Sequence, residues 1–111
     1  MSREERERLH DILGAIDAIR SHAAVADSAP PELVRDAILY RLVVIGEAVK
    51  ALPPAKLARQ PSVNWRGIAG LRDLLTHEYF RIERERIDEI IDQHLDPLDE
   101  AVGTMVAGLD E

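Results

Sequence analysis

Five side chains that can do chemistry lie in one short stretch, Gly70–Phe80, which reads GLRDLLTHEYF. They are Arg72, Asp73, Thr76, His77 and Tyr79. Because an α-helix has about 3.6 residues per turn, the first four share one polar side of a helix. The opposite side is apolar and is expected to face a core. It carries Ile68, Leu71, Leu74, Leu75 and Tyr79.

The types and spacing of Arg72 and His77 suit chemistry on a phosphodiester. A guanidinium is a permanent planar cation that can bind two phosphate oxygens at once. Next to it, an imidazole can move a proton from an RNA 2′-hydroxyl as that oxygen attacks its own phosphate, while the arginine stabilises the charge that develops. This reaction needs no metal ion, so we expect neither a metal nor a cofactor.

Asp73 and Thr76 are the expected supporting residues. Asp73 precedes His77 by four positions, so its carboxylate could accept a hydrogen bond from the imidazole and orient it. Glu47 and Lys50, one helix earlier, could line a cleft beside the pair. The spacing alone is weak evidence, since an exposed arginine and histidine on a helix surface give the same pattern.

Capping and periodicity signals predict the elements that position these residues. Ser2 and Glu5 form a capping box, Asn64 can cap a later helix, and Gly46 suggests close helix packing. We expect helices from Ser2 to about Ala26, from Pro31 to Leu52 and from Trp65 to Phe80, and another that begins near Glu83.

The last part of the chain leaves two interpretations open, because Pro97 either kinks the final helix or starts a fifth one that ends near Leu109. The first helix should bury Leu9, Ile12, Leu13, Ile16, Ile19 and Ala23. The second is apolar around most of its circumference, which predicts a central position. With no strand pattern, the predicted fold is all-α, an up-and-down bundle of four or five helices.

Composition and charge narrow the possible functions. The 111 residues suit one domain spanning 1–111, and the absence of cysteine excludes disulfides and thiolate metal sites. The net charge of −7 argues against a non-specific nucleic-acid coat. Between Lys56 and Arg86, however, the sequence has seven basic and four acidic residues. This locally positive segment suits either a phosphate ligand or a solvated surface.

No stretch approaches the roughly 20 apolar residues of a membrane span, and the first residues are charged where a signal peptide is apolar. We therefore expect a cytoplasmic protein without membrane contact. The other histidines, His10, His22 and His94, have no metal-ligand spacing and are expected to be exposed structural residues.

The stretch GLRDLLTHEYFRIE, preceded by PSVNW and by IGEAVKALP, resembles the HepT-like family of small helical proteins within the wider HEPN class. The resemblance covers essentially the whole chain, and this extended pattern is far more specific than the arginine–histidine spacing. The family motif is Arg-x4-His-x-Tyr, which Arg72, His77 and Tyr79 match. Asp73 stands where HEPN proteins often carry asparagine.

The resemblance implies a HEPN-like bundle and a function. Members are ribonuclease toxins of bacterial type VII toxin–antitoxin pairs, encoded beside a minimal nucleotidyltransferase that acts as antitoxin. By this resemblance Arg72 and His77 form the catalytic pair, and the partner modifies Tyr79 with AMP. It also implies a homodimer whose two motifs face one another across a cleft.

Three hypotheses follow from the sequence. The first is a metal-independent endoribonuclease that cuts RNA with Arg72 and His77. The second is a non-catalytic module that binds nucleotide, RNA or the nucleotidyltransferase, for which the acidic net charge and the few aromatic residues speak. A purely structural helical dimer leaves the polar side of the Gly70–Phe80 segment unexplained. For Tyr79, the alternative is a core tyrosine with its hydroxyl at the rim.

Overall fold

The computed structural model describes residues 2–79 and 81–109. In it, capping at Ser2 sets the start of the first helix. α1 (Arg3–Ala24) begins where the Ser2 Oγ accepts a hydrogen bond from the Glu5 backbone N–H at 3.1 Å. Only half of the predicted capping box forms, because the Glu5 carboxylate pairs with Lys56 instead. α1 ends two residues before the predicted end and is followed by the short 3₁₀ helix η1 (Ala26–Ser28).

The second helix, α2 (Pro31–Lys50), begins at the predicted proline, and a single turn, α3 (Pro54–Leu57), follows it. The helix predicted from Trp65 to Phe80 is interrupted at Gly70, giving α4 (Trp65–Ala69) and α5 (Leu71–Glu78). The Asn64 side chain caps α4 as predicted, by accepting the Gly67 N–H at 3.0 Å. The predicted end at Phe80 lies outside the described residues.

Pro97 lies inside a single long helix, α6 (Arg84–Leu109), so no separate fifth helix begins there. Arg20 of α1 bridges this position, with Nη2 2.6 Å from the Asp96 carboxylate and Nη1 2.7 Å from that of Asp99. Proline has no N–H to donate to the preceding turn, which weakens the helix at Pro97. The two contacts of Arg20 hold the residues before and after Pro97 against α1.

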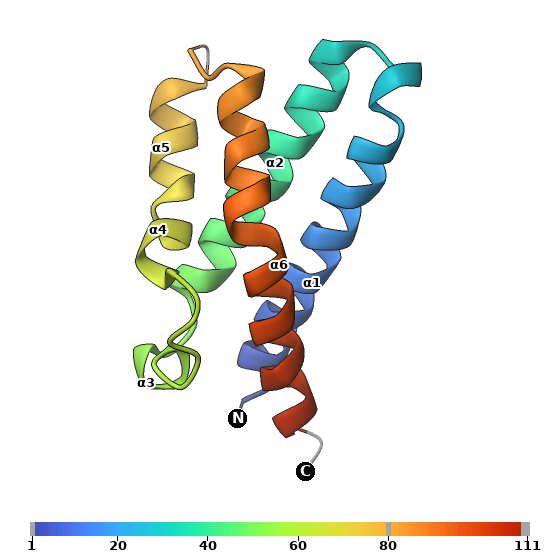
Figure 1. The fold of residues 1–111 in the computed structure, drawn as a ribbon. Helices are drawn as coiled ribbons and strands as arrows, with labels where there is room; N and C mark the ends of the chain where they lie inside the picture. Colours follow the sequence, from blue (N-terminus) through green and yellow to red (C-terminus); the bar gives the residue numbers. More distant parts are fainter. Residues whose placement is uncertain (1, 80, 110–111) are drawn as a thin grey trace.

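The long helices alternate in direction: α1 rises, α2 returns, α4 and α5 rise, and α6 descends (Figure 1). The all-α, up-and-down prediction is confirmed for the described residues. α2 packs on α1 on one side and on α4 and α5 on the other, while α6 packs mainly on α1. α2 therefore connects the core to the helix that carries the chemical residues.

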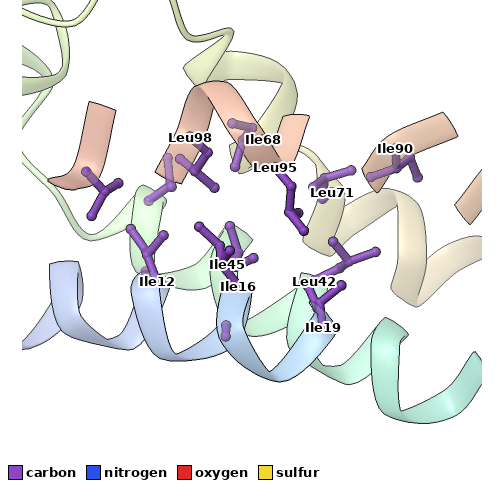
Figure 2. Close-up of a cluster of buried hydrophobic side chains, with 14 of the residues drawn as sticks. Ile12, Ile16, Ile19, Leu42, Ile45, Ile68, Leu71, Ile90, Leu95 and Leu98 are labelled. Atoms are coloured by element: carbon purple, nitrogen blue, oxygen red, sulfur yellow. The ribbon is translucent and has the colours of Figure 1, made fainter. Parts of the chain in front are cut away.

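Aliphatic side chains from every long helix meet in the centre of the bundle (Figure 2). The labelled ones are Ile12, Ile16, Ile19, Leu42, Ile45, Ile68, Leu71, Ile90, Leu95 and Leu98, all buried. Among the described residues, no polar side chain is fully buried. The site must therefore lie on the surface of the bundle.

The central position predicted for α2 is confirmed among the described helices, since α2 packs on α1, α4 and α5. One side of α2 nevertheless stays open, because its Leu33 and Tyr40 are each 62% exposed. The predicted burial of Ala23 is wrong: Ala23 lies in the last turn of α1 and is exposed. Of the described helices, none is long and apolar enough to cross a membrane.

Acidification is expected to weaken the fold through His94, which is half-buried rather than exposed as predicted. Burial, assisted by the nearby charge of Arg86, lowers the His94 pKa from its ordinary 6.5. Because the unfolded chain then binds the proton more readily, His94 contributes stability above about pH 6.5 that is lost as the pH falls through its lowered pKa.

The free energy of unfolding of wild type should therefore fall from pH 7 to pH 5 more than that of His94→Gln, as measured by urea unfolding. His10→Gln is the matched control, because His10 is exposed on α1. Equal losses in wild type and His94→Gln would show that His94 does not contribute.

Candidate functional site

Gly46 allows α2 and the beginning of α5 to approach closely. A Cβ atom at this position would lie 3.1 Å from the Arg72 backbone nitrogen and 3.3 Å from the Ile68 carbonyl oxygen. The close helix packing predicted for Gly46 is confirmed. It brings the backbone of Arg72 directly against α2.

A Gly46→Val substitution is therefore expected to destabilise the protein by about 1–3 kcal/mol, because the new side chain meets backbone atoms that cannot rotate away. Gly103→Ala is the contrasting control, since a Cβ atom there meets nothing within 4 Å. That change should stabilise the helix by roughly 0.5–1 kcal/mol. Thermal and urea unfolding measure both, and a Gly46→Val protein as stable as wild type would contradict the close approach.

Arg72 lies in a cluster of four charges contributed equally by α5 and α2. Its Nε is 2.7 Å from the Glu47 carboxylate, and its Nη1 donates to Asp73 at 3.1 Å. The Lys50 ammonium lies 3.7 Å from the other Asp73 oxygen. Glu47 and Lys50 thus lie beside the predicted site. The sequence alone had left their position undecided.

The predicted hydrogen bond between Asp73 and His77 is wrong: among the described residues, none joins the two side chains. Asp73 turns to Arg72 and Lys50 instead, because permanent cations attract a carboxylate more strongly than an imidazole does. These partners, Arg72 first, lower the Asp73 pKa. His77 is exposed one turn further along the same side of α5.

Thr76 is also on this side, but its hydroxyl serves its own helix. The Oγ1 donates to the Arg72 carbonyl at 2.9 Å and reaches the Asp73 carbonyl at 3.2 Å. This back-bonding is a common way for threonine to satisfy its hydroxyl within a helix. The Thr76 hydroxyl therefore contacts Arg72 and Asp73 through their backbone carbonyl groups and not through their side chains.

Tyr79 has the position of a core tyrosine whose hydroxyl lies at the surface, because its ring is half-buried against the core and its hydroxyl reaches the surface. The hydroxyl donates to the Asp36 carboxylate at 2.6 Å, and this bond raises the Tyr79 pKa. The Arg35 guanidinium lies 5.0 Å from the ring centroid and donates to the Tyr79 carbonyl. An open hollow of about 510 Å³ adjoins the hydroxyl, lined by Glu32, Arg35, Asp36, Tyr79 and Ile82.

A second hollow of about 290 Å³, here called the α2–α5 groove, runs between the two helices. Its lining residues are Asp36, Leu39, Tyr40, Val43, Leu75, Thr76 and Tyr79. Arg72 and Thr76 of α5 and Tyr79, which directly follows α5, recur at helical spacing, so the groove leads from the tyrosine towards the charged cluster. The most exposed of its large apolar side chains is Tyr40.

Sequence reasoning missed Arg35 and Asp36. One signal was available: Asp36, Tyr40, Val43, Glu47 and Lys50 follow one another at steps of three or four residues, which places them on one side of α2. Two of these residues pair with α5 in the structure. Antiparallel helices then bring Asp36, at the other end of the series, to Tyr79.

The fold and the site together define a helical bundle with an arginine–histidine pair exposed along one helix edge. Such an edge can bind a phosphate group and move a proton next to it, without a buried pocket. The chain belongs to the ribonuclease HepT-like family, whose model matches residues 10–105.

Three relatives show the range of similarity. A protein of Methanocaldococcus jannaschii, whose name assigns it provisionally as an RNase, is 49% identical over 55 residues, which is 50% of this chain and 46% of the relative. A similarly named protein of Caldanaerobacter subterraneus is 40% identical, and the match covers 64% of this chain and 68% of that relative. The probable ribonuclease HepT of Thermococcus cleftensis is 31% identical, and the match covers 75% of this chain and 78% of that relative. The chain thus spans about half the length of the first relative, and no solved structure matches it.

Proposed function

We propose that the protein is a metal-independent endoribonuclease that cuts RNA with Arg72 and His77. The observation that carries the proposal is the exposed guanidinium, fixed by two carboxylates, on the same edge of α5 as an exposed imidazole. Membership of a ribonuclease family supports it. His77 would take the proton of the attacking 2′-hydroxyl, and Arg72 would stabilise the negative charge on the phosphate oxygens. The bond between phosphorus and the 5′ oxygen would break as that oxygen takes up a proton. The products would carry a 2′,3′-cyclic phosphate and a 5′-hydroxyl.

The active form that we propose is a homodimer with both motifs at one cleft. One protomer supplies one histidine to its motif, whereas this reaction needs a base for the nucleophile and an acid for the leaving group. Leu33 and Tyr40 are both exposed and, seven residues apart, lie on the same side of α2, which a second copy of the chain would cover in such a dimer. A rate that rises and falls around neutral pH would fit an acid and a base acting together.

The proposed biological role is that of the toxin in a type VII toxin–antitoxin pair, held inactive by a nucleotidyltransferase that transfers AMP to Tyr79. In support, the Tyr79 hydroxyl reaches the surface beside an open hollow large enough to admit a ligand. The added phosphate would bring negative charge and bulk to the end of the α2–α5 groove, where they would hinder RNA from reaching Arg72.

Short RNA substrates test the proposal against a non-catalytic binding module. We expect cleavage of an all-ribose oligonucleotide and none of a copy in which every 2′-hydroxyl is replaced by hydrogen, because the nucleophile is then missing. Calorimetric titration of both oligonucleotides measures binding separately. Binding of the ribose form without turnover would favour the binding module.

A further inference from the structure

The ion pair between Glu47 and Arg72 has no evident role in stability. The two side chains are 52% and 46% exposed, and ion pairs at such positions contribute little to stability. The core beneath them is complete without it, since Leu42, Ile45 and Leu71 are buried by their own packing. Glu47 nevertheless lies 2.7 Å from Arg72 Nε.

We infer that Glu47 is a positioning residue that orients the Arg72 guanidinium for the transition state. This inference rests on the proposed ribonuclease function and adds to it a residue outside the α5 motif. Glu47 acts through Arg72 and does not itself touch RNA.

The physical reason is the freedom of an arginine side chain. An exposed arginine side chain loses rotamer entropy when it is fixed in one orientation. Without a partner such as Glu47, Arg72 would lose this entropy only when it binds the substrate. Glu47 at Nε and Asp73 at Nη1 hold the planar group from two directions before substrate arrives. A cation held in advance stabilises developing charge without having to reorganise during the reaction.

The backbone of the site makes this contact reproducible. Gly46, next to Glu47, lets α2 lie against the Arg72 backbone, so the carboxylate begins close to its partner. One turn further along α2, Lys50 attracts Asp73. Two neighbouring positions of α5 are thus paired with two positions of α2 on consecutive turns, which fixes the rotation of the edge that carries His77.

The test is steady-state cleavage of a short RNA by wild type, Glu47→Gln and Glu47→Asp, with Glu78→Gln as matched control. Glu78 is exposed beside His77, and its substitution removes the same charge without touching Arg72. We expect Glu47→Gln to lower kcat roughly 10- to 100-fold. Its KM should stay the same or fall, because a negative charge near the RNA has been removed. Glu47→Asp should recover part of kcat. Glu78→Gln should keep the wild-type kcat, and its KM should stay the same or fall as in Glu47→Gln, because the same charge has been removed.

Each outcome decides a different point. If Glu47→Gln keeps the wild-type kcat while wild type cuts RNA, the positioning inference is wrong and the proposed function stands. If wild type does not cut RNA, the proposed function fails. NMR of the arginine Nε–H groups then tests the contact alone, since an Arg72 signal that is unchanged in Glu47→Gln would overturn the orientation by Glu47 as well.

Discussion

Replacing Arg72 with lysine is expected to lower kcat for RNA cleavage roughly 100- to 1,000-fold. Lysine keeps the positive charge but loses the planar fork that can hold two phosphate oxygens together. It also cannot make the present contacts to Glu47 and Asp73 with one rigid group. The loss should therefore appear mainly in kcat, with a smaller change in RNA affinity.

The fold should survive this substitution, because Arg72 is 46% exposed and its ion pairs contribute little to stability. Arg84→Lys is the matched control: Arg84 is exposed at the beginning of α6, away from the charged cluster, and its replacement should leave kcat near wild type. Equal activity of Arg72→Lys and wild type would mean that Arg72 contributes only charge.

His77→Ala should lower cleavage by a factor of about 100 to 10,000, the range over which a positioned acid or base contributes to rate. His77 is exposed, has no hydrogen bond to Asp73 among the described residues, and contributes little to the core. The variant should therefore unfold at the wild-type temperature, and RNA binding through Arg72 should persist.

His10→Ala provides the control for the loss of an exposed histidine on another helix. It should cut RNA at the wild-type rate. A His77→Ala protein that is folded and cuts as fast as wild type would remove the proton-transfer role from His77 and redirect the search for a base.

Periodicity was a good guide to the fold where a helix has a continuous apolar side. Ile12, Ile16 and Ile19 of α1 were expected in the core and are buried. Periodicity failed at the end of α1, where Ala23 is exposed, and it did not show which side of the central helix α2 stays open, because an apolar residue type does not reveal whether another element covers it. Tyr40 is such a residue, apolar in type but exposed in the isolated chain.

The interruption at Gly70 shows a different limit. The periodic pattern runs through this glycine without a gap, yet the helix divides into α4 and α5 there. The backbone stays in the helical region at Gly70, with φ −73° and ψ −13°. This small departure from regular helix geometry depends on how α4 and α5 each pack against α2. Such packing between elements cannot be read from the local sequence.

For the site, the sequence located the motif but misassigned one contact within it. Helix spacing puts Asp73 within reach of His77, and no rule of local sequence sets Lys50 closer to that carboxylate. The contact depends on the approach of α2 at Gly46. Cross-helix partners such as Glu47 and Asp36 become identifiable only when the pairing of α2 with α5 is known.

The most direct test of the central claim is RNA cleavage in EDTA by purified wild-type protein, after intact mass has shown that Tyr79 is unmodified. The proposed chemistry predicts fragments that end in a 2′,3′-cyclic phosphate and begin with a 5′-hydroxyl, formed without metal and absent with His77→Ala. Fragments with a 3′-hydroxyl that form only when magnesium is added, at equal rates in both proteins, would contradict it.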